Sequence, residues 1–149
     1  MKNLFILLFA FVLFACNTDK SNNNRSGNVT GLDFNENLPP DFLKFHMRFH
    51  QDSIYQIEHI AFPLPGIPNM AYDLPQDSID SFHWTSEEWI MHKPYNYSED
   101  FSRKYITYSP NLIGELIFEK QSGFGIERRF SKTKSGWKLI YYVGMNEVQ

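Results

Sequence analysis

The last third of the chain contains four apolar-rich runs separated by polar turns, at positions 103–108, 112–120, 124–130 and 137–145. β-Branched and aromatic residues dominate each run, and Gly, Ser, Pro and Asn collect between the runs, which is typical of strands joined by turns. The pattern predicts a four-stranded antiparallel meander with one apolar face. Such a face has to be covered, and the preceding residues supply the cover.

The junction between the second and third runs predicts their register. Gln121, Ser122 and Gly123 form a three-residue loop that ends in Gly, the residue that most readily adopts the left-handed conformation such hairpins need. Lys120 then pairs with Phe124. The side chains that share the apolar face are, in facing pairs, Phe118 and Ile126, Leu116 and Arg128, and Gly114 and Phe130.

Arg128 is a charged residue on this predicted apolar face. It therefore lines a pocket, pairs with an acid such as Glu58, or leaves the face through a bulge. Trp137 is expected in the core opposite Phe130.

Apolar residues before the meander recur at helical spacing. Phe42, Phe45 and Phe49 form the stripe of an amphipathic helix that starts in the segment 38–41. A second short helix, capped by Asp52 or Ser53, is expected to direct its isoleucines inward, and these are Ile54, Ile57 and Ile60.

Two further segments complete the predicted cover. Residues 61–66 contain two prolines and are expected to form an edge strand or an extended segment. Thr85 and Glu88 have the spacing of a capping box, which predicts a third short helix that ends at Lys93 and Pro94.

The N-terminus has the pattern of an export signal over residues 1–15. Lys2 precedes an apolar run of about twelve residues, which is too short to span a bilayer as an ordinary helix. The run ends in Leu13-Phe14-Ala15-Cys16, which resembles the lipobox of bacterial lipoproteins. The resemblance implies that the chain is cut before Cys16 and is anchored in the lipid bilayer through acyl groups on this residue. Cys16 is the only Cys in the chain, so no intramolecular disulfide is expected.

Residues 16–37 contain almost nothing to bury and are rich in Asn, Ser, Gly and Thr, which predicts a flexible tether to a domain at 38–149. Surface-export signals of Bacteroidota lipoproteins place several acids directly after the Cys, whereas only Asp19 is close here. An anchor in the cell envelope that faces the periplasm is therefore expected.

Charge is distributed unevenly along the chain. Residues 16–100 carry 13 acids and 5 bases, whereas residues 101–149 carry 4 acids and 8 bases. The whole chain has a net charge of −3, which argues against nucleic acid as a partner.

The predicted order of elements, two helices, a short strand, a short helix and a four-stranded meander, resembles the cone-shaped α+β fold of nuclear transport factor 2 and its relatives. The run DFLKFHMRFHQDSIYQIEHIAFPLPG and the late SGWKLIYYVGM resemble a family of small Bacteroidota lipoproteins, grouped as a domain of unknown function with an NTF2-like or cystatin-like fold. The resemblance covers roughly residues 38–145. Its motifs are aromatic and structural, so it implies a fold and leaves the function open.

Three functions are compatible with this resemblance. We expect a binding or interaction module without a cofactor. The alternatives are a small-molecule lyase or isomerase that uses the cone, and a structural subunit of an envelope complex. Enzymes with NTF2-like folds use Asp, His or Tyr residues that point into the cone. Inward candidates in this sequence are His59, His83, Tyr105, Arg128 and Tyr141, although hydrogen-bonded groups at the edge of the core are the simpler interpretation.

His46 and His50 have the spacing of two metal ligands on one helix face. The intervening residues lack the Glu of a metalloprotease helix, and no Cys is available. The sequence therefore favours two partly exposed histidines and no metal.

A basic segment near the C-terminus contains Arg129, Lys132, Lys134 and Lys138. Such a segment is either a solvated loop or a contact for an anionic envelope glycan or lipid, with binding that weakens as salt rises. Separately, Ser53 and Ser78 follow Asp and precede Ile, which resembles a Bacteroidota O-glycosylation sequon.

Overall fold

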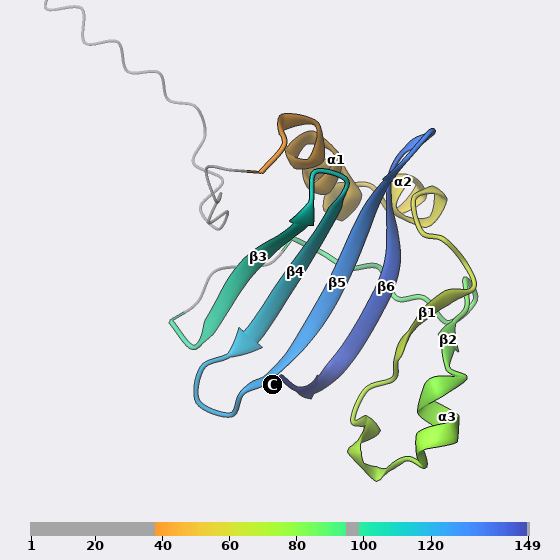
Figure 1. Cartoon of the computed structure of the whole chain (residues 1–149), viewed down its shortest axis with the longest axis vertical. Helices are drawn as coiled ribbons and strands as arrows, with labels where there is room; N and C mark the ends of the chain where they lie inside the picture. The colour runs from red at the N-terminus through yellow and green to blue at the C-terminus, as the bar shows by residue number, and fades with distance from the viewer. Residues whose placement is uncertain (1–37, 95–98, 149) are drawn as a thin grey trace, which may run out of the picture.

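The computed structural model describes residues 38–94 and 99–148 (Figure 1). The predicted signal peptide, the tether and Cys16 lie outside the described residues. In chain order the elements are α1 (Pro40–Gln51), α2 (Ser53–Glu58), β1 (Leu64–Ile67), the 3-10 helix η1 (Ala71–Asp73), α3 (Gln76–Asp80), β2 (His83–Trp84), β3 (Phe101–Ser109), β4 (Leu112–Glu119), β5 (Phe124–Thr133) and β6 (Gly136–Glu147). Among these helices, none is long and apolar enough to cross a membrane.

The sheet has six strands in the order β2-β1-β6-β5-β4-β3, so the prediction of a four-stranded sheet is wrong. Strands β3 to β6 pair antiparallel in chain order, β1 joins β6 in parallel, and β2 pairs with β1. Strand β1 is therefore an interior strand, and not the edge strand that the two prolines of residues 61–66 predicted. Gly66 permits its approach to β6, because a Cβ at this position would lie 1.9 Å from the carbonyl oxygen of Tyr142.

The register of β4 and β5 differs by one residue from the predicted register. Glu115, and not Leu116, pairs with Arg128. The strands are joined by the four residues 120–123, with Gly123 at φ +72° and its N–H donating to the carbonyl oxygen of Glu119. Neighbouring strand residues point to opposite faces. The shift by one residue therefore turns the alternate set of β4 side chains toward the helices. The β4 side chains that are buried there are Ile113, Glu115 and Ile117.

Helix α1 covers the inward face of the sheet through its aromatic stripe. Phe42, Phe45 and Phe49 are buried as predicted, and their ring centroids lie 5.6, 5.7 and 5.6 Å from that of Phe130 on β5. Complete burial of each such ring contributes roughly 1.5–3 kcal/mol. In Figure 1, α1 and α2 lie at one end of the sheet, while α3 lies beyond β1 and β2.

Trp137 is in the core at 3% exposure, but it does not face Phe130. Its strand partner is Lys132, and Phe130 pairs with Leu139. Strand β5 continues to Thr133, and its tight turn pairs Thr133 with Gly136, which places Trp137 two residues beyond Phe130.

Helix α2 begins as predicted at Asp52, whose Oδ1 accepts the N–H of Tyr55 at 3.0 Å. Of the predicted inward set only Ile60 is buried, at 5% exposure, because Ile54 and Ile57 are 73% and 40% exposed whereas Gln56 is fully buried. Helix α2 therefore packs against the core through the polar side chain of Gln56, which the spacing of apolar residues does not predict to be buried.

The third helix is displaced along the chain. The Thr85 hydroxyl donates a hydrogen bond to the Glu88 carboxylate, but the residues that follow Thr85 form a turn and not a helix. Helix α3 forms at Gln76–Asp80 instead. Trp84 and Trp89, which flank the turn, pack against Tyr142 on β6. Tertiary contacts of these aromatic rings thus override the local capping signal.

Candidate functional site

A carboxylate is buried on the inward face of the sheet. Glu115 is 1% exposed, and its Oε2 accepts a hydrogen bond from Nη1 of Arg128 at 2.9 Å. Its Oε1 accepts the hydroxyl of Tyr105 at 3.3 Å and lies 3.9 Å from Nη1 of Arg103. His46 places Nε2 3.1 Å from Oε2. We call these five residues the Glu115 cluster.

The neighbouring charges determine the protonation state of the Glu115 carboxyl. Burial alone raises the pKa of the Glu115 carboxyl, but His46 and Arg128 outweigh burial and hold this pKa well below its usual range. Burial and the Glu115 charge together raise the pKa of the Tyr105 hydroxyl. Glu115 is therefore ionised at neutral pH and held as an ion pair, which is unsuitable for a general acid.

Two neutral histidines border the Glu115 cluster. Burial, and then the charge of Arg128, lowers the pKa of His50 to about 3 and that of His92 to about 2. His92 accepts the Nε–H of Arg128 on Nδ1 at 3.0 Å. His46 and His50 are 5% and 3% exposed, so the prediction that they are partly exposed is wrong.

The sequence missed Glu115 because both faces of β4 are apolar between its two glutamates, Glu115 in the middle and Glu119 at the end. A one-residue choice of register then decided whether Glu115 pointed inward or outward. The prediction that Arg128 pairs with an acid was compatible with the structure, but the partner is Glu115 and not Glu58. An inward-facing Arg in the middle of β5 was the available signal for a buried acid on a neighbouring strand.

The five predicted pocket residues lie in three places. Tyr105 and Arg128 belong to the Glu115 cluster, whereas His83 and Tyr141 line a groove on the opposite face of the sheet. His59 stacks on Tyr55 with ring centroids 3.7 Å apart and bonds the carbonyl oxygen of that residue.

The groove runs between the η1–α3 segment and the outer face of the sheet. Its main part has a volume of about 500 Å³, and a second part of about 270 Å³ shares Ile67, Gln76, Ile79 and Tyr141 with the first. We call the two parts together the outer groove. The main part is lined by Ile67, Ala71, Tyr72, Gln76, Ile79, Leu116, Gly125, Glu127, Arg129, Tyr141, Val143, Asn146, Glu147 and Val148.

Arg129 lies in the wall of the outer groove between two aromatic rings. Its guanidinium carbon is 4.5 Å from the ring centroid of Tyr141 and 6.0 Å from that of Tyr108, and its Nε donates to Glu127. This hydrogen bond to Glu127 raises the pKa of the Arg129 guanidinium. The main part also contains Glu147, so its carboxylates outnumber its one guanidinium.

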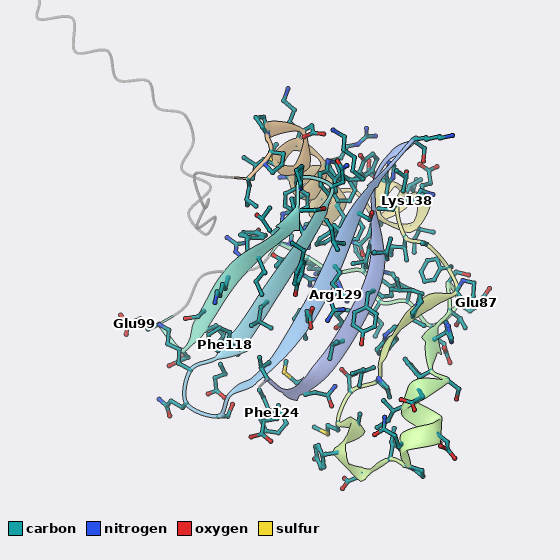
Figure 2. All side chains as sticks on the ribbon, in the orientation of Figure 1. Glu87, Glu99, Phe118, Phe124, Arg129 and Lys138 are labelled. Atoms are coloured by element: carbon teal, nitrogen blue, oxygen red, sulfur yellow. The ribbon has the colours of Figure 1, made fainter. Side chains whose placement is uncertain are left out.

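The four predicted basic residues do not form one surface. Arg129 lies on the outer face, midway along the sheet, whereas Lys138 is near the far end of the β5–β6 hairpin (Figure 2). Lys132 pairs with Asp41 of α1 at 2.6 Å, which places it on the helix side, and Lys134 is exposed in the turn. The segment is thus divided between a groove wall and a hairpin tip.

Ser53 and Ser78 are both exposed at the surface. Asp52 caps α2, which accounts for the first Asp-Ser pair without a glycan.

Two solved structures from Bacteroides resemble this chain. A cystatin-like protein from Bacteroides caccae matches with a TM-score of 0.52 at 16% sequence identity, over 68% of this chain and 74% of that one. An NTF2-like protein from Bacteroides fragilis matches with a TM-score of 0.49 at 17% identity, over 72% of this chain and 47% of that one, so this chain spans about half the length of that protein. No family model and no curated protein matches this sequence. The likeness to the cystatin-like protein concerns the fold alone, an α+β fold.

Proposed function

We propose that this protein is a cell-envelope lipoprotein, anchored through an acylated Cys16, whose NTF2-like domain binds a neutral saccharide in the outer groove. The observation that carries the proposal is the combination of a concave site of about 500 Å³ with an aromatic wall and a paired carboxylate and guanidinium.

The chemistry of the outer groove suits a polyhydroxylated ring. Glu127 and Arg129 are bonded to each other through only one atom of each, so the remaining carboxylate oxygen and N–H groups offer an adjacent acceptor and donors. Vicinal hydroxyl groups need this arrangement. Tyr141 and Tyr72 add aromatic surface, and Leu116 and Val143 add aliphatic surface for the apolar face of a sugar.

Charge favours a neutral ligand over an anionic one. Glu127 and Glu147 outnumber Arg129 in the main part of the outer groove, and Asp80 adds a third acid in the second part. An anionic glycan or lipid is therefore repelled there, and a contact of that kind is a separate prediction for Lys132, Lys134 and Lys138. N-acetylglucosamine, the neutral sugar of the peptidoglycan strand, is within reach of an envelope anchor, so an oligomer of this sugar is the chosen probe.

The alternatives have less support. A lyase or isomerase in the cone needs a free acid or base, whereas Glu115 is ion-paired and its carboxyl pKa is well below its usual range. A structural subunit would use the exposed aromatic residues of the groove side, Tyr72 at 66% and Tyr108 at 50% exposure, for a protein partner.

The binding proposal is tested by calorimetry on the full chain in detergent, with a neutral chitotriose as ligand. We expect saturable binding that Tyr141→Ala weakens on the order of tenfold, because one stacked ring contributes roughly 1.4 kcal/mol. A variant with Lys132, Lys134 and Lys138 changed to Ser is the matched control and should bind normally. Absence of binding, or equal binding by Tyr141→Ala, contradicts the proposal.

A further inference from the structure

His46, His50 and Glu115 bring two imidazole nitrogens and a carboxylate oxygen within 4.8 Å of one another, and all three residues are buried. We propose that these side chains bind a divalent transition metal ion, with Zn²⁺ the ion that best fits two imidazoles and one carboxylate. The proposal concerns the interior of the domain and is independent of the outer groove.

His50 is prepared as a ligand by its backbone contact. Its Nδ1 lies 2.9 Å from the carbonyl oxygen of His46, so Nδ1 carries the proton and Nε2 presents a lone pair. Metal-bound histidines almost always donate the second ring N–H in this way, because the bond fixes both the tautomer and the ring orientation.

His46 supplies the second, independent observation. Its side chain is 7% exposed, and its Nε2 lies 3.1 Å from Oε2 of Glu115, but among the described residues this nitrogen has no hydrogen bond of good geometry. A ligating imidazole points at the metal ion and not at the neighbouring ligand, which is compatible with this geometry.

The spacing requires only a small adjustment. Bonds of about 2.0–2.1 Å on a tetrahedral Zn²⁺ place the ligand atoms roughly 3.4 Å apart. His46 Nε2 and Glu115 Oε2 are already 3.1 Å apart, and no pair among the three ligand atoms exceeds 4.8 Å. His46 and His50 are one turn apart on α1, so both imidazoles lie on the helix face that covers Glu115.

Arg128 weakens metal binding, because its guanidinium lies 2.9 Å from Oε2 of Glu115 and already compensates the negative charge of this carboxylate. Zn²⁺ therefore has to bind beside a cation, and its affinity is lower than for an equivalent site without one. His92 accepts the Nε–H of Arg128, which helps to fix the position of the guanidinium. The buried Glu115 carboxylate can thus be compensated by Arg128, by the metal ion, or by both together.

The test uses the full chain with Cys16→Ser, which removes its only thiol, in detergent after treatment with a chelator. Calorimetric titration with Zn²⁺ should show one site, and the melting temperature should rise with free Zn²⁺. His46→Gln and His50→Gln should each weaken binding by at least about tenfold, the lower bound for loss of a metal-site group. His59→Gln is the matched control, because His59 lies outside the ligand set, and it should bind as the parent does.

The variant Arg128→Met distinguishes a metal site from a cluster that is only an ion pair. Without metal this variant should melt well below the parent, because Glu115 loses its nearest counter-charge, and Zn²⁺ should raise its melting temperature more than it raises that of the parent. A chain that binds no Zn²⁺, a site that is unchanged in His50→Gln, or an Arg128→Met variant that Zn²⁺ does not stabilise would each overturn the proposal.

Discussion

At the scale of single residues, the inside of the molecule depends on one carboxylate and its counter-charges. Glu115 is fully enclosed, with Arg128 bonded to one oxygen and Arg103 and Tyr105 near the other. Such an arrangement contributes little net stability compared with an apolar core, but removal of one partner leaves a buried charge without compensation.

Glu115→Gln should therefore lower the free energy of unfolding by about 3–5 kcal/mol. Urea denaturation measures the change. Glu119→Gln, on the same strand near the surface, is the control and should change stability by less than about 0.5 kcal/mol. Adding Arg128→Met to Glu115→Gln should recover part of the loss, since both charges are then absent. A single variant as stable as the parent would mean that the buried ion pair is not formed.

His92 makes stability depend on pH. Its folded pKa of about 2 is depressed from an ordinary value of 6.5, so the unfolded chain binds more protons between these values. The contribution of His92 is present above pH 6.5 and is lost as pH falls toward 2. His50, whose pKa is about 3, acts in the same direction.

Between pH 7.5 and 5.5 the loss of stability should be about 3 kcal/mol in the presence of a chelator, and His92→Asn should reduce this loss by about 1.4 kcal/mol. Asn keeps an acceptor for Arg128 but does not titrate. His83→Asn, at an exposed position, is the control. Urea denaturation at the two pH values checks the prediction, and an equal pH dependence in His92→Asn would refute it.

The limit of sequence reasoning at this scale was the face of β4. Leu116 and Phe118 on one side, and Ile113 and Ile117 on the other, are equally apolar, so alternation could not choose the register. The aromatic stripe of α1 was predictable because helical periodicity gave a single apolar side.

At the scale of elements, one amide ties α2 to the segment before β3. Gln56 donates from Nε2 to the carbonyl oxygens of Phe49 and His92, at 2.6 and 2.8 Å. Its Oε1 accepts the His92 N–H and the Trp89 indole N–H, at 2.8 and 3.0 Å. The amide thus positions the segment that carries His92 against Arg128.

Gln56→Leu, which conserves volume, should cost about 3 kcal/mol, because it leaves buried donors and acceptors without partners. Gln51→Leu, at the exposed end of α1, is the control. Amide hydrogen exchange at residues 89–92 supplies a local measure and should accelerate only in Gln56→Leu. Unchanged exchange there would show that Gln56 does not hold the segment.

The sequence predicted α1, the start of α2 and the runs that form β3 to β6, since each has a strong local pattern. It missed α3 and the entry of β1 into the sheet because both depend on tertiary contacts. Strand β1 has only four residues, one of them Pro65, and its pairing depends on the space that Gly66 leaves beside Tyr142.

At the scale of the whole molecule, the sheet separates two environments. The helix side contains the aromatic core and the Glu115 cluster, whereas the other side carries the outer groove under η1 and α3. A proposed lipid anchor at Cys16 would hold this two-sided domain in the envelope.

Anchoring should depend on Cys16 alone, because the chain has no other thiol. Cys16→Ser should therefore abolish incorporation of labelled palmitate and leave the signal peptide uncleaved at this site. Palmitate labelling and the apparent mass of the product report the two effects. Labelling equal to that of the parent would exclude a lipoprotein.

The central claim, that the outer groove is the ligand site, is tested most directly by mapping amide chemical shifts of the ¹⁵N-labelled full chain in detergent during titration with neutral chitotriose. We predict saturable shifts at residues 65–67, 71–79, 125–129 and 141–148, and their loss in Tyr141→Ala. Shifts confined to the hairpin tip at 132–138, shifts confined to the helix side around Glu115, or no shifts at all would contradict the account.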